Sequence, residues 1–341
     1  MRHRATRLFA PASFLVSMTM QTTPVAGQWP PDTLRNLRVL PSDIRVDSLV
    51  SLMAGFTRAL GVRCTHCHLG QETQPLAEYD FVSDDKATKR MARAMLRMVE
   101  QINLEHLAGL ESRSEPAVRV ECFTCHRGAR EPRTLQSVLL LAYDAGGADS
   151  AIAAYRVLRE REYGRAVFDF GEVALADVAT AVASRDQHAD AERLAALNVE
   201  MNAKSAFAKR QHGSFALGIA FRAGPAAGRA RYEELLGRYG NSVLVQPLLH
   251  QIGRALLARN EHGPALALFQ LVVERYPDSW NAHDALADVY AASGNVAEAI
   301  QEYERALALD PANATVLEKL RRLRGRQEAD AAGSPPDESS R

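Results

Sequence analysis

Every cysteine of this chain lies in one of two copies of the pattern Cys-x-x-Cys-His. The first copy occupies residues 64–68 and the second residues 122–126. Two thiols three positions apart can each form a thioether with one vinyl group of a haem, and the adjoining histidine then reaches the iron from the same side. The pattern therefore predicts two covalently bound haem c groups, with thioethers from Cys64, Cys67, Cys122 and Cys125 and iron ligation by His68 and His126.

Three other kinds of site use paired cysteines. Two Cys-x-x-Cys pairs can form a tetrahedral zinc site, one pair can act as a thioredoxin-like redox centre, and cysteines in an oxidising compartment can form disulfides. None of these accounts for the histidine that follows each pair directly, His68 in the first copy and His126 in the second. Haem c is therefore the preferred interpretation.

Residues 1–27 are predicted to be a secretory signal peptide. Arg2, Arg4 and Arg7 precede an apolar stretch, and Val25-Ala26-Gly27 supplies small residues for cleavage. The apolar stretch is short and interrupted for a membrane-spanning helix, so an uncleaved anchor is the alternative. Because haem c is attached outside the cytoplasmic membrane, we expect an exported protein in a bacterial periplasm or on the cell surface.

The charge balance argues against a nucleic-acid partner. Lysine plus arginine and aspartate plus glutamate each total 41, and no block of five like charges occurs. With 341 residues, of which 47% are hydrophobic, the chain can form two globular domains.

A helix is predicted just before the first haem-binding pattern. Asp47 or Ser48 can cap its start, and Gly61 supplies a left-handed stop. Apolar residues recur between them at helical spacing, namely Leu49, Leu52, Met53, Phe56 and Leu60. Met53 lies about two turns before the end of this helix, so one short segment could supply both a sulfur ligand and the attachment residues.

A second helix is predicted from Ser83 or Asp84 to about Leu107. Its apolar side is expected to carry Met91, Met95, Met98 and Ile102, which recur at helical spacing. Its exposed side is expected to be basic, with Lys86, Lys89, Arg90, Arg93 and Arg97.

The region from about Leu135 is alanine-rich, contains no cysteine and shows a period of 34 residues. This is the length of a tetratricopeptide repeat, in which small residues lie where two helices touch and an aromatic residue lies on the second helix. The residue pairs that define the period are Gly253 and Ala287, Ala265 and Ala299, Phe269 and Tyr303, and Pro277 and Pro311.

Residues 246–279 and 280–313 resemble this repeat closely, and weaker copies lie upstream at 149–159, 188–202 and 232–239. We therefore predict a short right-handed helical solenoid over residues 135–325. Thr315 to Arg324 is expected to form a closing helix, and residues 326–341 a disordered tail.

The segment from about Leu34 to Pro132 resembles the cytochrome c subunit of photosynthetic reaction centres and its relatives in non-phototrophic bacteria. The resemblance rests on three stretches that occur in order: Leu52-Met53 with residues 64–68, then Met95 to Met98 leading to Ile102-Asn103, then residues 122–128. In that family each haem-binding unit is a helix with a methionine ligand, a turn, and then the pentapeptide.

The resemblance implies that Met53 ligates the first iron and Met95 the second. Because extra residues separate Met95 from Cys122, Met98 or Met91 are alternatives for the second iron. The family subunit carries four haems in two halves, whereas this chain has sites for one half. The family histidine that ligates a haem across the halves falls near Gly109, so it is absent, and His106 is not expected to be a ligand.

The sequence thus predicts an all-α protein in which a dihaem c-type cytochrome domain, residues 28–134, precedes a tetratricopeptide-like domain, residues 135–325. The expected function is single-electron transfer between redox protein partners without a bond-making reaction, with the repeats docking a protein. The alternatives are a peroxidase-like dihaem enzyme with one open iron site, and a scaffold whose function lies in the repeats.

Overall fold

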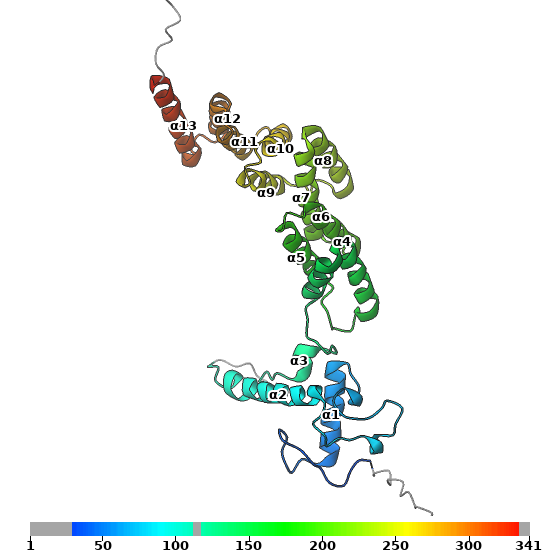
Figure 1. Cartoon of the computed structure of the whole chain (residues 1–341). Coiled ribbons are helices and arrows are strands. Elements are labelled where there is room, and N and C mark those ends of the chain that lie inside the picture. The colour runs from blue at the N-terminus through cyan, green and yellow to red at the C-terminus, as the bar shows by residue number, and fades with distance from the viewer. Residues whose placement is uncertain (1–28, 112–116, 334–341) are drawn as a thin grey trace, which may run out of the picture. The chain divides into compact units, whose positions relative to one another are not determined.

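The computed structural model describes residues 29–111 and 117–333, with side chains to residue 328. The predicted signal peptide and the end of the predicted tail lie outside the described residues. Within these ranges every regular element is a helix, and the only β-type pairing is an isolated bridge between Leu69 and Asp80. The all-α prediction is therefore confirmed. The chain divides into two compact units, an N-terminal unit that ends at Pro132 and a repeat unit that begins at Arg133 (Figure 1).

The N-terminal unit is built from short helices. They are α1 (Val46–Leu60), the 3-10 turns η1 (Cys64–His66) and η2 (Leu76–Glu78), α2 (Ala87–Gln101), the π-helical turn η3 (Ile102–Leu107) and α3 (Cys122–His126). Gly61 ends α1 in the left-handed conformation, with φ of 64°, as the sequence predicts. A glycine adopts this conformation without the steric cost that a Cβ atom would bring.

Helix α2 begins later than predicted, at Ala87 rather than Ser83 or Asp84. The Ser83 hydroxyl accepts a hydrogen bond from the Asp85 N–H (3.0 Å), and the Lys89 ammonium donates to the carbonyls of Phe81 (2.8 Å) and Ser83 (2.7 Å). These bonds satisfy polar backbone groups of the loop without helical geometry, and the helix therefore starts later.

The prediction of an exposed basic side on α2 is wrong for two of its cations. Lys89 is only 8% exposed, and the Arg93 guanidinium donates to the Asp84 carboxylate (2.6 Å) and to the Asn36 carbonyl (3.0 Å). The preceding loop concentrates acceptors here, which compensates the cost of burying the charges. The methionine side of α2 faces outward instead, with exposed fractions of 62% for Met91, 39% for Met95 and 44% for Met98.

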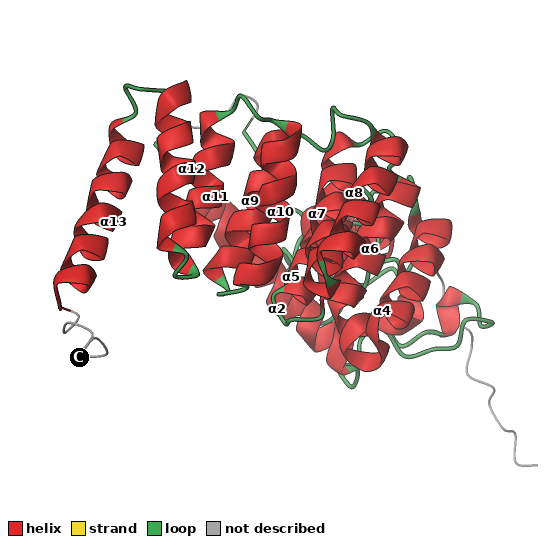
Figure 2. Ribbon diagram, turned by 90° about the horizontal axis from the view of Figure 1, so that it is seen from above, coloured by secondary structure: helices red, strands yellow, loops and turns green. Residues whose placement is uncertain are grey.

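The repeat unit is a row of helices in which sequence neighbours pack in pairs (Figure 2). The pairs are α5 with α6, α7 with α8, α9 with α10, and α11 with α12. The helices are α4 (Leu135–Glu162), α5 (Glu172–Ala183), α6 (His188–Met201), α7 (Ala206–Ala223), α8 (Pro225–Tyr239), α9 (Gln246–Ala258), α10 (His262–Arg275), α11 (Trp280–Ala292), α12 (Val296–Leu309) and α13 (Ala314–Gly333).

The 34-residue period corresponds to real helix pairs. The predicted repeat 246–279 is the pair α9 and α10, and the repeat 280–313 is the pair α11 and α12. At the contact between α9 and α10 a Cβ atom on Gly253 would lie 2.4 Å from the ring of Phe269, so only glycine fits at this point. The weaker copies also fall on helices, although α4 is kinked at Gly146 and Gly147.

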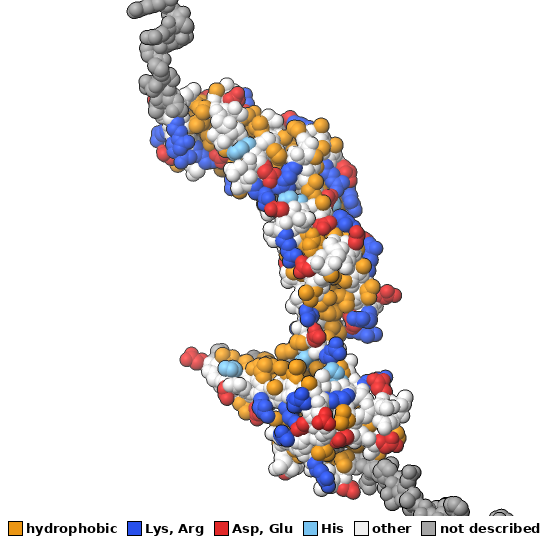
Figure 3. Space-filling model, viewed as in Figure 1, with side chains coloured by type: hydrophobic (Ala, Val, Ile, Leu, Met, Phe, Trp, Pro, Cys, Tyr) orange, Lys and Arg blue, Asp and Glu red, His pale blue; other side chains and the backbone are white. Residues whose placement is uncertain are grey.

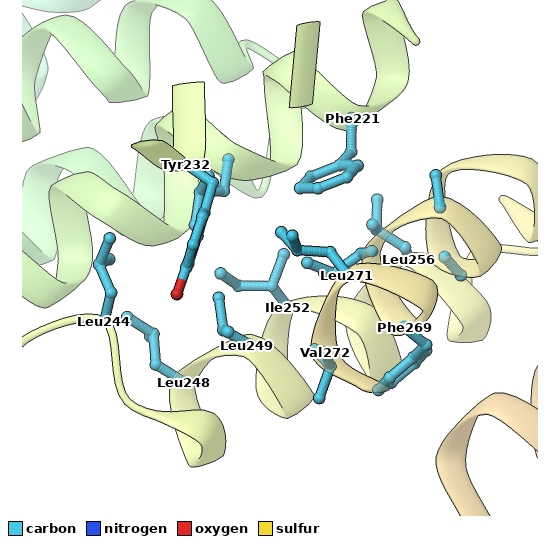
Figure 4. Packing of buried hydrophobic residues seen from close by; sticks show 14 of the residues in the cluster. Phe221, Tyr232, Leu244, Leu248, Leu249, Ile252, Leu256, Phe269, Leu271 and Val272 are labelled. Atoms are coloured by element: carbon cyan, nitrogen blue, oxygen red, sulfur yellow. The ribbon is translucent and has the colours of Figure 1, made fainter. Parts of the chain in front are cut away.

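The largest core of the repeat unit runs from α7 to α11, and Figure 4 shows part of it. Phe221, Tyr232 and Phe269 supply its aromatic rings, and each is 1% exposed. Leu249 and Ile252 of α9 lie between the two helix pairs and contact both. Burial of this continuous apolar surface holds neighbouring pairs together.

The prediction of a disordered tail from residue 326 is wrong for residues 326–333. Helix α13 continues to Gly333, so residues 326–333 are helical rather than disordered. This stretch is rich in alanine, glutamate, glutamine and arginine, which favour helices, and the glycine and prolines of the tail begin only at Gly333.

We expect Phe269→Ala to lower the free energy of unfolding of the repeat unit by about 3–5 kcal/mol, because it leaves a cavity in the core. Phe207→Ala is the matched control, since the Phe207 side chain is 42% exposed and its loss should cost under about 1 kcal/mol. Urea unfolding followed by circular dichroism measures both changes. Equal losses in the two variants would contradict the packing described.

Candidate haem-attachment sites

The first attachment segment, residues 64–68, is a tight helical turn. The N–H groups of Cys67 and His68 both donate to the Cys64 carbonyl, at 3.1 and 3.0 Å. The start of α2 holds this turn from outside, because Lys86 Nζ donates to the Thr65 carbonyl. The Thr88 hydroxyl likewise donates to the carbonyl of His66. One turn of backbone therefore carries both thiols and the imidazole.

His68 lies in an aromatic environment and is half-buried. Its ring meets Phe81 edge-on with centroids 4.8 Å apart, and Phe81 stacks on Trp29 at 4.7 Å. Burial, together with the charges of Lys89, Lys86 and Arg93, lowers the pKa of His68 to about 4. The imidazole is therefore neutral at physiological pH, which is the form that ligates a metal. Its Nδ1 atom is buried and has no hydrogen-bond partner among the residues that the structure describes.

The second attachment segment is helix α3 itself. A capping box fixes its start, in which the Thr124 hydroxyl accepts from the Glu121 N–H (2.9 Å) and the Glu121 side chain accepts from the Thr124 N–H. His126 Nδ1 lies 3.0 Å from the Ala129 carbonyl. In the tautomer that donates this bond, Nε2 carries the free lone pair, as is usual for an iron-ligating histidine.

Asn103 joins the end of α2 to the segment that precedes Cys122. It is buried in the π-helical turn, and its Nδ2 donates to the carbonyls of Val99 (2.9 Å) and Val120 (2.8 Å). Its Oδ1 accepts from the Val120 N–H at 2.8 Å. Local spacing gives Asn103 no role, because its partner Val120 lies 17 residues further along the chain. The available signal is a polar side chain next to Ile102 near the end of the predicted helix.

The two attachment segments are held side by side by a backbone contact. The N–H of Gly128, two residues after His126, donates to the carbonyl of Ala59 at 2.8 Å. A Cβ atom on Gly61 would lie 2.0 Å from the Gly128 carbonyl oxygen, so the two chains approach as closely as glycine allows. The sequence predicts Gly61 as a helix stop and gives no sign of this contact, because Gly128 lies far along the chain.

The candidate methionine ligands lie on α1 and α2, and none of them is fully buried by the protein. Met53 is half-buried on α1, and Met91, Met95 and Met98 share the exposed side of α2. Figure 3 shows hydrophobic side chains gathered along the position of α2. Among the described residues of the N-terminal unit, Ala59 is the only hydrophobic residue that is fully buried. These apolar sides, with thioether sulfurs on them, fit a large planar apolar group such as haem.

The arrangement of the cysteines bears on two of the alternatives, disulfides and a shared zinc site. All four are free thiols. Across residues 29–111 and 117–333 no three or more His, Cys, Asp or Glu side chains converge on a point where a metal ion would fit. The two cysteine pairs therefore do not assemble a common zinc site.

Comparison with known families agrees with this geometry. Residues 32–139 match the family described as photosynthetic reaction centre cytochrome C subunit. Residues 248–279 match the tetratricopeptide repeat family, and residues 287–320 match a second family of the same repeat. The chain joins a partial reaction-centre cytochrome c subunit domain to tetratricopeptide repeats.

Individual relatives match one part of the chain each. The photosynthetic reaction center cytochrome c subunit of Rubrivivax gelatinosus is 33% identical over 101 residues, which are 27% of this chain and 26% of the relative. The Hsp70-Hsp90 organizing protein of Triticum aestivum is 31% identical over 87 residues, 24% of this chain and 15% of that protein. The chain thus spans about a quarter or less of the length of these relatives.

Among solved structures, MamA from Desulfovibrio magneticus RS-1 is similar to 47% of this chain over 87% of its own length, with 16% identity and a TM-score of 0.30.

A cytochrome c domain suggests electron transfer and haem c, and tetratricopeptide repeats suggest protein binding. No helix within the described ranges combines the length and the apolar character needed to cross a bilayer.

We expect Gly61→Ala to destabilise the N-terminal unit. A left-handed alanine costs about 1–2 kcal/mol, and its Cβ atom would also push Gly128 away. Gly55→Ala is the matched control on the same helix, because nothing lies within 4 Å of the added Cβ atom and alanine favours a helix interior by about 0.5–1 kcal/mol. Thermal unfolding measures the stability of both variants. Equal unfolding temperatures would contradict the contact between Gly61 and Gly128.

Proposed function

We propose that this protein is an exported carrier of single electrons that binds two haem c groups and docks a protein partner through its repeats. The observation that carries the proposal is the pair of helical Cys-x-x-Cys-His turns, with free thiols, held together at Gly61 and Gly128. In this proposal residues 1–27 direct export to a periplasm or cell surface, residues 28–134 bind haem, and residues 135–325 dock the partner.

Each haem is assigned its own set of residues. Cys64 and Cys67 anchor the first haem, with His68 and Met53 as its iron ligands. The second set consists of Cys122 and Cys125 as anchors and of His126 and Met95 as iron ligands, with Met98 or Met91 as alternatives to Met95. The position of His68 in an aromatic environment and the bond from His126 to the Ala129 carbonyl support the proximal assignments.

Haem c, when bound, supplies an iron that gains or loses one electron. The cysteines would fix the group covalently, and the histidines would ligate its iron. A methionine thioether as second ligand would raise the reduction potential and leave no iron position for oxygen or peroxide. These residues therefore favour a carrier over a redox enzyme, and the Gly61–Gly128 contact supports a carrier in which both haems belong to one compact unit.

We expect the exported wild-type chain to carry two haems. Cys64→Ala combined with Cys67→Ala should leave one haem, and so should Cys122→Ala combined with Cys125→Ala, because each pair anchors its own group. Thr65→Ala is the control and should keep both, since the Thr65 side chain has no part in the attachment. Intact-protein mass spectrometry and a pyridine haemochrome assay count the haems. A wild-type chain without haem, or with zinc in its place, would refute the proposal.

Methionine variants test the remaining ligands. The oxidised protein should contain only low-spin iron and show the near-infrared band of sulfur-to-iron charge transfer. Met53→Ala should remove about half of this band because it exposes one of two irons. One of Met95→Ala, Met98→Ala and Met91→Ala should remove the half of the band that belongs to the second iron, namely the variant that replaces its ligand. The other two should leave the band unchanged and so serve as controls. An unchanged band in all four variants would rule out methionine ligation.

A further inference from the structure

The repeat unit contains a groove of about 690 Å³ that the haem-binding proposal does not use. It lies between the second part of α4, α6, the start of α7 and the end of α8. Four basic side chains line it, and one carboxylate, Glu200, accompanies them. The basic residues are Arg156, Arg193, Lys209 and Arg238.

Two of these cations are already neutralised by neighbours. Arg156 pairs with Glu200 at 3.2 Å, and Arg193 pairs with Asp149. Lys209 and Arg238 form no ion pair within the described part of the chain, and the Arg238 guanidinium lies 5.2 Å from the ring centroid of Tyr239. The groove therefore presents unbalanced positive charge, although the whole chain has a formal net charge of zero.

The floor of the groove is apolar. Leu197 and Val199 of α6 are buried beneath it, and Ile152, Ala196 and Tyr239 are half-buried along it. An apolar floor below unbalanced cations suits a ligand that carries both carboxylates and apolar side chains. A protein segment has this composition, whereas an inorganic anion would use the charge and leave the floor uncovered.

We propose that this groove binds an acidic segment of a partner protein, with Lys209 and Arg238 as the main contacts to its carboxylates. The inference rests on the proposed docking role of the repeats and specifies the surface and the chemistry of the partner. Complementary charge of this kind increases the rate of association and selects the partner, while the apolar floor contributes to the lifetime of the complex.

The test uses the full haem-loaded chain and a fluorescein-labelled peptide that interleaves glutamate with leucine. Fluorescence anisotropy should show binding that weakens as salt is added. Lys209→Glu combined with Arg238→Glu should reduce the affinity about tenfold or more, because attraction becomes repulsion. The matched control is Arg254→Glu combined with Arg321→Glu. It makes the same change in net charge at exposed positions outside the groove and should leave the affinity unchanged.

Three results would overturn the proposal: an equal loss of affinity in both double variants, equal binding of a peptide with glutamine in place of glutamate, and displacement of the peptide by inorganic phosphate at comparable concentration. Circular dichroism first establishes that both variants are folded. The haem content of the same samples is measured separately. A chain that carries two haems but does not bind the peptide would contradict the groove proposal alone, whereas a chain without haem would contradict the electron-carrier proposal.

Discussion

The hydrogen bond from the Gly128 N–H to the Ala59 carbonyl connects the ends of the two cysteine-bearing segments, and the N-terminal unit is arranged around it. It requires a helix that stops at Gly61 and a loop that turns back immediately after α3. Both conditions depend on glycine, because each of the two residues has a positive φ and their backbones are in contact. The result is that two sequence-distant attachment segments occupy one small region.

The rest of the N-terminal unit is held by polar contacts more than by an apolar core. Lys89 and Arg93 tie the loop before α2 to that helix, and Asn103 ties the end of the helix to the segment before α3. The methionine side of α2 stays exposed, and the apolar residues of α1 are only partly buried. The repeat unit is the opposite case, since its buried aromatic and aliphatic side chains form extended cores between helix pairs.

Features that depend on local spacing could be predicted from the sequence. The spacing of cysteines and of apolar residues predicted the attachment segments and the helix before the first of them. The 34-residue period predicted the helix pairs α9–α10 and α11–α12. Prediction from the sequence failed where contacts between residues distant in the chain decide whether a side chain is buried. Lys89 is a typical exposed helix residue by composition, and only the loop carbonyls folded against it explain its burial. The Gly61–Gly128 contact and the groove beside Arg238 depend on tertiary packing and leave no periodic signal.

We propose that two six-coordinate haem irons in one compact unit pass single electrons. A spectroelectrochemical titration of the exported chain, followed at the haem absorption bands with and without carbon monoxide, measures this property. We expect uptake of two electrons per chain by low-spin iron, in two one-electron steps, with no change in spectrum when carbon monoxide is added. Uptake of a single electron, or a high-spin iron that binds carbon monoxide readily, would contradict it.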